Sequence, residues 1–202
     1  MLLSSRVKET KTSITLKVNE KINQLTASGR HIYNMTGGQL NVKPSVEFIE
    51  SISKQLNFSK SYHYSPIAGM KKLREKFMDH VQEKREISFN SEDDDTEYEC
   101  IISNGSKHSL YNVIGALLNP GDEVIILTPY WVSYPEMVKF WGGTPVVVKS
   151  HAFDAYTPPI DEIARVISPR TKAIILNSPN NPAGIHYSDE WMKDFARFIK
   201  KH

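Results

Sequence analysis

The alternation of short apolar segments with helical segments in the second half of the chain constrains the fold most. Four segments are apolar and short enough to be strands: Glu99–Ser103, Glu123–Thr128, Thr144–Val148 and Lys172–Leu176. Helical segments alternate with them: Ser106–Leu118, Ser133–Trp141, Ile160–Ile167 and Asp189–Lys200. This spacing predicts βαβ units and an α/β fold with a mostly parallel sheet.

The first half of the chain has a different texture. We expect helices at Thr15–Ser28, Ser45–Leu56 and Met70–Lys84, and a short strand at His31–Met35. Lys60–Gly69 is expected to be a loop rich in aromatic residues. The acidic run 92–95 is expected to be a solvated loop, because packed like charges repel.

Composition excludes several classes of function. The 202 residues fit one large domain or one and a half small ones, and the net charge of +2 gives no nucleic-acid footprint and no polybasic membrane patch. The single cysteine, Cys100, excludes an internal disulfide and fits a reducing compartment. The histidines lack metal-ligand spacing, and no apolar run reaches the ~20 residues of a membrane helix. We expect a soluble, cytoplasmic protein without a metal, a nucleic-acid partner or a membrane partner.

The segment Asn104-Gly105-Ser106-Lys107 lies between a predicted strand and a predicted helix. Glycine lets the backbone approach a ligand, and the amides that open a helix favour an anion, most simply a phosphate. Lys107 adds positive charge and Ser106 a hydroxyl. The alternative is that Ser106 is an ordinary helix N-cap.

Two more strand ends lead into notable loops. Trp131 follows the strand Glu123–Thr128 and could stack on a flat ligand ring, or it could be a core residue. The loop Asn177–Gly184 follows the strand Lys172–Leu176, and its prolines prevent a regular element. It is either a rigid connection or a ligand-binding loop. Because parallel strands end at one edge of a sheet, these loops predict a site for a planar phosphorylated cofactor.

The residues that carry these features resemble the class I aminotransferases, which are fold-type I enzymes that use pyridoxal 5′-phosphate (PLP). Four motifs occur in the family's order: Ser103–Lys107, Leu118–Glu123, Pro129–Pro135 and Asn177–Gly184. The resemblance extends from about Ser13 to the C-terminus and is strongest to the bacterial aspartate aminotransferase subgroup. It implies a three-layer α/β/α large domain. Residues 46–202 would form the N-terminal half of this PLP-binding domain, and residues 1–45 an arm and part of a small domain.

The resemblance assigns roles to cofactor contacts. Gly105, Ser106 and Lys107 match the loop that binds the PLP phosphate. Trp131 matches the residue that stacks on the pyridine ring, and Asn181 matches the one that hydrogen-bonds the ring's phenolic oxygen.

Further roles concern the substrate and the neighbouring subunit. Tyr64 matches a tyrosine that reaches the phosphate of the neighbouring subunit, which implies a homodimer. Gly38 matches a glycine near the substrate carboxylate. Lys107, with help from Ser13–Thr15, matches a group that holds the distal carboxylate of acidic substrates. Trp131 and Asn181 also border the substrate.

One family feature has no counterpart here. The Schiff-base lysine of the family lies downstream of every matched residue, so the chain has no catalytic residue to assign and is expected to be inactive alone. The leading interpretation is the N-terminal half of an aminotransferase, truncated or completed by a second chain. Its parent reaction would transfer an amino group from an acidic amino acid such as aspartate to a 2-oxo acid. The alternatives are a PLP lyase or synthase of the same fold, a non-catalytic remnant or binding module, and an α/β domain without cofactor.

The resemblance also implies which strands can pair. In that family strand three pairs with strand two, and strand two pairs with strand four. Strand one, here Glu99–Ser103, would be separated from them by strands that this chain lacks. The free edge of strand four, Lys172–Leu176, would then be exposed, and an exposed edge favours aggregation.

Overall fold

The computed structural model describes residues 2–9, 14–36, 38, 40–87, 89 and 98–202. They form two compact units. The first comprises Met1–Gly37 and Tyr111–His202, and the second comprises Gly38–Leu110. The acidic run 92–95 lies outside the described residues.

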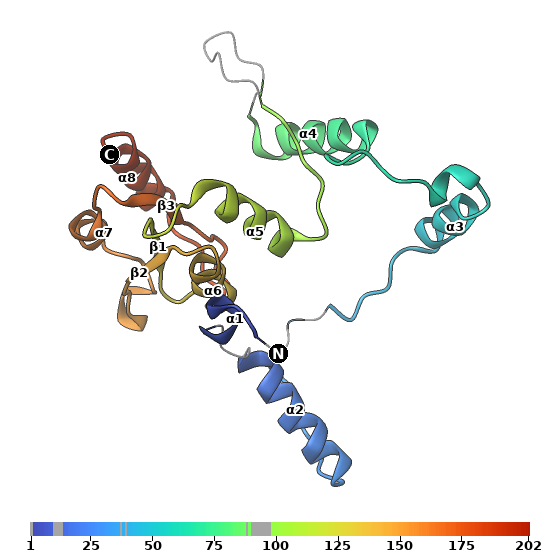
Figure 1. Cartoon of the computed structure of the whole chain (residues 1–202), viewed down its shortest axis with the longest axis horizontal. Coiled ribbons are helices and arrows are strands. Elements are labelled where there is room, and N and C mark those ends of the chain that lie inside the picture. Colours follow the sequence, from blue (N-terminus) through green and yellow to red (C-terminus); the bar gives the residue numbers. More distant parts are fainter. Residues whose placement is uncertain (1, 10–13, 37, 39, 88, 90–97) are drawn as a thin grey trace. The chain divides into compact units, whose positions relative to one another are not determined.

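A parallel sheet forms the centre of the first unit (Figure 1). Its strands are β1 (Glu123–Leu127), β2 (Thr144–Val148) and β3 (Thr171–Ile175), in the order β2-β1-β3. Both neighbours run parallel to β1, and all five residues of β1 are buried. A run of β-branched residues buried on both faces is typical of the central strand of such a sheet. The predicted pairing of strands three, two and four is confirmed.

Helices cover the sheet in the α/β arrangement that the sequence predicted. The helices that follow the strands are α6 (Ser133–Phe140), α7 (Ile160–Val166) and α8 (Asp189–Ile199), and the short helix η2 (Ala152–Asp154) precedes α7. One cluster of buried side chains packs α7 and α8 against the sheet. Its members are Ile125 and Leu127 of β1, Val148 of β2, Ile163 of α7 and Phe195 of α8. Since side chains alternate along a strand, the buried Val124 and Ile126 face the opposite side of β1.

The helix α5 (Ser106–Leu117) packs closely against the end of α6. A Cβ built on Gly115 would lie 2.5 Å from Cε2 of Trp141, so the indole occupies the space above this glycine. The indole Nε1–H donates to the carbonyl of Tyr111 at 3.0 Å, and the two rings lie 5.1 Å apart. Glycine is needed at position 115 because any side chain would displace the tryptophan.

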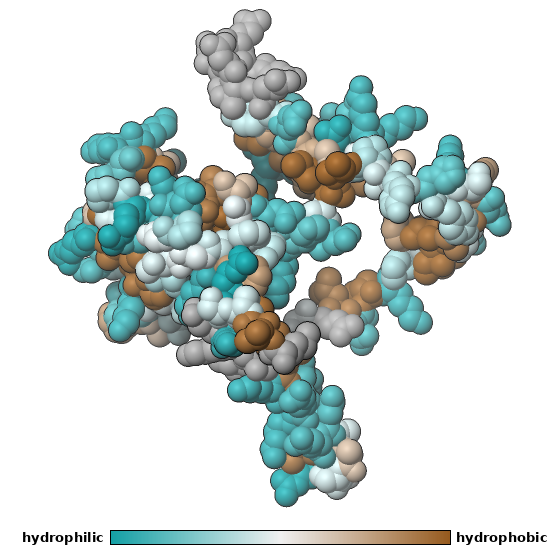
Figure 2. Space-filling model, in the orientation of Figure 1, coloured by the Kyte–Doolittle hydropathy of each residue, from teal (hydrophilic) through white to brown (hydrophobic). Residues whose placement is uncertain are grey.

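The second unit contains α3 (Val46–Gln55), the 3-10 helix η1 (Ser59–Tyr62) and α4 (Lys71–Arg85). Ser45 caps α3, because its hydroxyl accepts a hydrogen bond from the Phe48 amide. Apolar side chains gather over α3 in Figure 2, and the exposed ones include Val46, Phe48, Ile49 and Ile52. The N-terminal helices α1 (Ser5–Glu9) and α2 (Ile14–Ala27) belong to the first unit. Within the described ranges, no helix has the length and apolarity that crossing a membrane requires.

Two predicted strands are wrong. Glu99–Ser103 and His31–Met35 are not strands in the structure. A strand needs a neighbour that supplies a ladder of hydrogen bonds. The Ile102 amide makes one backbone bond, to the Ala68 carbonyl at 3.0 Å, which is an isolated contact rather than a ladder.

Candidate functional site

The loops that follow β1 and β3 lie at the same edge of the sheet, because both strands run parallel. The first loop brings Trp131, which is half-buried, directly before α6. Its ring meets Tyr134 edge-on, with centroids 5.6 Å apart. Tyr134 is buried, and this burial raises the pKa of its phenol. Trp131 therefore packs against Tyr134 of α6 and keeps part of its surface exposed.

Asn180 joins the two loops. Its side-chain amide donates to the carbonyl of Pro129 at 3.0 Å, and its Oδ1 accepts from the Ala183 amide at 3.1 Å. Its own backbone N–H donates to the Ile185 carbonyl at 2.6 Å. Only 7% of Asn180 is exposed. A buried amide with this many partners holds its neighbours in one arrangement, because breaking any of its bonds leaves a buried polar group unpaired.

Asn181 lies at the surface beside this buried junction. Its backbone N–H donates to Oδ1 of Asn177 at 2.9 Å, and the side-chain amide of Asn177 donates to the Pro179 carbonyl at 3.1 Å. The side chain of Asn177 thus bonds two backbone groups of its own loop, while the side chain of Asn181 is exposed. The peptide bonds Ser178-Pro179 and Asn181-Pro182 are cis, as is Thr128-Pro129 in the neighbouring loop.

The end of β2 supports the Trp131 loop from the other side. The Ser150 amide donates to Oγ1 of Thr128 at 2.9 Å, and the Ser150 hydroxyl bonds the Thr128 carbonyl. Ser150 is buried. The loop after β1 is therefore held by Ser150 at one residue and by Asn180 at the next. The sequence analysis missed both residues; the position of Asn180 between two prolines of a strand-end loop was the available signal.

Tyr187 lies behind the Asn177–Gly184 loop. Its amide donates to the hydroxyl of Ser178 at 3.1 Å, and its ring is buried against Trp191 at a centroid distance of 4.5 Å. Burial raises the pKa of the Tyr187 phenol, and a hydrogen bond with Asn180 opposes the rise. The loop therefore packs against a buried tyrosine ring whose phenol hydrogen-bonds Asn180.

The predicted phosphate loop belongs to the second unit. Gly105 has φ +81°, a conformation that favours glycine, and its carbonyl accepts from the amides of His108 and Ser109. Ser106 and Lys107 begin α5. Nδ1 of His108 accepts from the Asn104 amide at 3.2 Å, a contact that the sequence analysis did not anticipate. The start of α5 thus has the glycine turn and helix-opening amides that bind anions.

Gly38 and Tyr64 are also part of the second unit, and both are exposed. The structure therefore brings together the loops of Trp131 and Asn181, whereas the other predicted site residues lie on the second unit. Ser13, which was expected to assist Lys107, lies outside the described residues.

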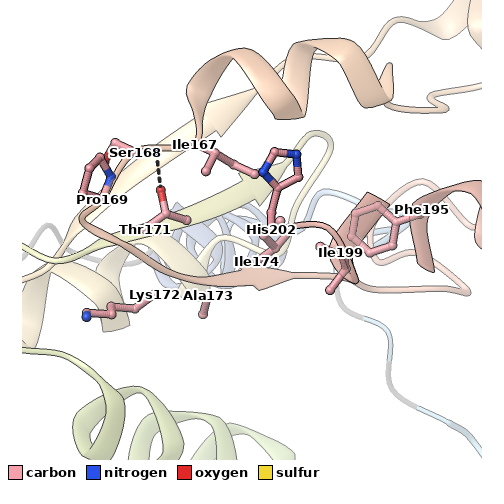
Figure 3. Close-up of a pocket in the computed structure, with 10 residues that line it drawn as sticks. All are labelled: Ile167, Ser168, Pro169, Thr171, Lys172, Ala173, Ile174, Phe195, Ile199 and His202. Atoms are coloured by element: carbon pink, nitrogen blue, oxygen red, sulfur yellow. Dashed lines mark hydrogen bonds between the residues drawn. The ribbon is translucent and has the colours of Figure 1, made fainter. Parts of the chain in front are cut away.

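A pocket of about 520 Å³ opens beside β3, away from these loops (Figure 3). Apolar side chains from the end of α7, from β3 and from α8 line it, chiefly Ile167, Ala173, Ile174, Phe195 and Ile199. The Ser168 amide at its rim already donates to Oγ1 of Thr171. The pocket shares no residue with the strand-end loops and has few converging polar groups, so it is not the candidate site.

Comparison with known proteins identifies the family. A family model described as aminotransferase class I and II matches residues 30–202. The chain belongs to this family. It is 38% identical over 200 residues to a probable aspartate/prephenate aminotransferase of Thermus aquaticus, with 99% of this chain and 50% of that protein covered. It is 34% identical over 202 residues to an aspartate aminotransferase of Geobacillus stearothermophilus.

Solved structures agree with this membership. The structure of a Thermus thermophilus aspartate aminotransferase with maleate superposes on the whole of this chain with a TM-score of 0.89 at 35% identity, covering 51% of that protein. The chain thus spans about half the length of the curated relatives it matches.

Proposed function

We propose that this aminotransferase chain provides the PLP-binding half of a PLP-dependent aminotransferase. One observation supports it above the others: the hydrogen bond from Asn180 to Pro129 holds the loops of Trp131 and Asn181 together at one edge of the sheet. These loops bear the two side chains that the family uses on the cofactor ring.

The residues fit PLP, which is flat, aromatic and phosphorylated. Trp131 offers an aromatic face, and the exposed Asn181 offers an amide to a ring oxygen. Gly105, Ser106 and Lys107 offer helix-opening amides and a positive charge to the phosphate. When bound, PLP supplies the electron sink for chemistry at an amino acid's Cα. The chain's own residues fix the tilt of the ring and neutralise the phosphate.

The substrates are proposed from the relatives' names and from the matched residues. Aspartate aminotransferases among the relatives favour an acidic amino acid such as aspartate and a 2-oxo acid. Gly38 and Lys107 would contact the substrate, and Tyr64, whose side chain is fully exposed, would reach the neighbouring subunit of a homodimer. We also propose the division into residues 1–45 and 46–202 and a cytoplasmic location.

The lysine that binds PLP covalently in this family matches no residue here. We therefore propose that catalysis needs a further polypeptide segment, on this chain or another, that brings this lysine as the group that moves the substrate proton.

PLP titration with absorbance detection tests the cofactor proposal. Trp131→Leu and Asn181→Ala should each raise the dissociation constant roughly tenfold, the equivalent of about 1.4 kcal/mol. Trp131→Phe is the matched control, because it keeps an aromatic face at the same position. Equal affinities in all four proteins would contradict the assignment.

Borohydride reduction of the mixture separates the remaining interpretations. PLP that is bound reversibly and never fixed to a lysine indicates that the segment with the lysine is missing. The intact mass of the protein from its own cells then decides how it is supplied. A mass near 23.0 kDa requires a second chain, and a mass near twice that value places the lysine on the same chain.

A further inference from the structure

We propose that Asn180 is a positioning residue, which sets the place of Trp131 relative to Asn181 by joining the loop after β1 to the loop after β3. This inference rests on the proposed function, in which both side chains contact the PLP ring. Nothing in the family assignment gives a role to this residue, and Asn180 itself does not reach the surface where Asn181 lies.

The geometry favours positioning over simple packing. The side-chain amide of Asn180 uses both of its ends on the loops: Nδ2 donates to Pro129 at 3.0 Å, and Oδ1 accepts from Ala183 at 3.1 Å. Pro129 is two residues before Trp131, and Ala183 is two residues after Asn181. A shift of the amide would therefore move both cofactor-facing residues together.

Burial gives this junction its stiffness. Asn180 is 7% exposed, so water cannot easily replace either partner. A buried carbonyl or amide left without a partner costs more free energy than a neutral hydrogen bond normally contributes. Ser150 holds the preceding residue, Thr128, from β2. The Trp131 loop is thus held by Asn180, which belongs to the Asn181 loop, and by Ser150, which does not.

This difference provides a matched pair of variants. Asn180→Asp keeps the Oδ1 acceptor for Ala183 and the size of the side chain, but it removes the donor to Pro129. Ser178→Ala removes the hydroxyl that accepts from the Tyr187 amide and leaves both hydrogen bonds of the junction intact. Both are made in the full chain, labelled with 5-fluorotryptophan, and the three indole ¹⁹F resonances are assigned with Trp131→Phe, Trp141→Phe and Trp191→Phe.

The first readout needs no cofactor. Asn180→Asp should shift and broaden the Trp131 resonance, whereas the Ala183 amide, whose acceptor is kept, should stay protected from exchange. The resonance of Trp141 should stay in place, since its indole contacts Tyr111 and Gly115 of α5 rather than the junction. Ser178→Ala should leave the Trp131 resonance unchanged. An unchanged Trp131 resonance in Asn180→Asp overturns the proposal. Loss of all three resonances also overturns it, because Asn180 would then support the whole sheet.

The second readout uses PLP itself. Asn180→Asp should weaken PLP binding roughly tenfold. It should also change the induced circular dichroism of the bound cofactor, which reports the tilt of its ring, and Ser178→Ala should do neither. If the wild-type chain binds no PLP while Asn180→Asp still moves Trp131, the proposed function fails and the junction stands. If PLP binds equally to both and Trp131 does not move, the junction fails and the proposed function stands.

Discussion

The guanidinium of Arg170 binds the buried carboxylate of Glu123 at the start of the central strand. Its Nε and Nη2 both donate to Oε1 of Glu123, at 3.0 and 2.6 Å, and the Ser168 hydroxyl donates to Oε2 at 2.6 Å. The side chain of Glu123 is only 8% exposed, whereas that of Arg170 is 69% exposed. Both oxygens of this carboxylate accept from the turn before β3, so the ion pair joins two neighbouring strands.

This contact predicts a stability that falls in acid. The pKa of Glu123 lies below its usual value of 4.5, first because Ser168 donates to it and then because of Arg170, while burial works in the opposite direction. The unfolded chain therefore binds a proton at a higher pH than the folded chain does. The stabilisation is complete above the usual value and is lost as pH falls through the lowered pKa.

Thermal unfolding of the wild type and Glu123→Gln at a series of pH values checks this. The glutamine variant should have the lower Tm at neutral pH, and the difference should shrink as the solution is acidified. In a Ser168→Ala background, the difference in Tm should disappear at a higher pH, because the main cause of the lowered pKa of Glu123 is removed. A difference in Tm that stays constant with pH would show that the carboxylate is not held in its charged form.

The space above Gly115 gives a second prediction. Gly115→Ala should destabilise the protein by about 1–3 kcal/mol, because the new methyl group would overlap the Trp141 ring. This would outweigh the gain of about 1 kcal/mol that alanine brings to a helix interior. Urea unfolding measures the net change in unfolding free energy from these two opposing effects. In a Trp141→Leu background the same substitution should become neutral or stabilising, and equal effects in both backgrounds would place the cost elsewhere.

The start of α8 gives a third prediction. Ser188 caps this helix, since its hydroxyl accepts from the Trp191 amide at 3.2 Å. Ser188→Ala should lower the unfolding free energy by about 1 kcal/mol. Ser188→Asp, which keeps the acceptor, should restore most of that loss and serves as the control. If the aspartate variant is as unstable as the alanine variant, the hydroxyl is not acting as a cap.

The buried face of α7 gives a fourth prediction. Ile163 is fully buried in the cluster beneath the sheet, whereas Ile52 of α3 is 48% exposed. Ile163→Ala should cost about 2–5 kcal/mol, through lost burial and a residual cavity. Ile52→Ala should change the unfolding free energy by no more than about 0.5 kcal/mol. Similar losses at both positions would mean that α3 is packed in solution.

The sequence predicted features that depend on local pattern. The strand Glu123–Thr128 was recognisable because its apolar run is flanked by turn residues, and the structure has β1 at Glu123–Leu127. The loop of Asn181 was recognisable from its prolines. In contrast, Glu99–Ser103 has a strand's composition but no ladder partner, and pairing is a property of the whole sheet.

The site's supports were not predictable for the same reason. Asn180 and Ser150 act through partners that are distant in sequence, such as Pro129 for Asn180 and Thr128 for Ser150. No spacing rule links such positions, because the register of the sheet decides which residues meet. The sequence therefore indicated the loops that carry Trp131 and Asn181, and the structure added the residues that hold those loops.

The central place of β1 also bears on the order in which the chain assembles. Glu123 pairs with Thr144 on one side and with Thr171 on the other, so the second pairing closes a loop roughly twice as long. Doubling a loop adds only about 0.6 kcal/mol of closure entropy. Chain entropy alone therefore hardly discriminates between the two neighbours. The pairing of β3 with β1 brings the hydrogen bonds of Ser168 and Arg170 to Glu123, which the pairing of β2 does not.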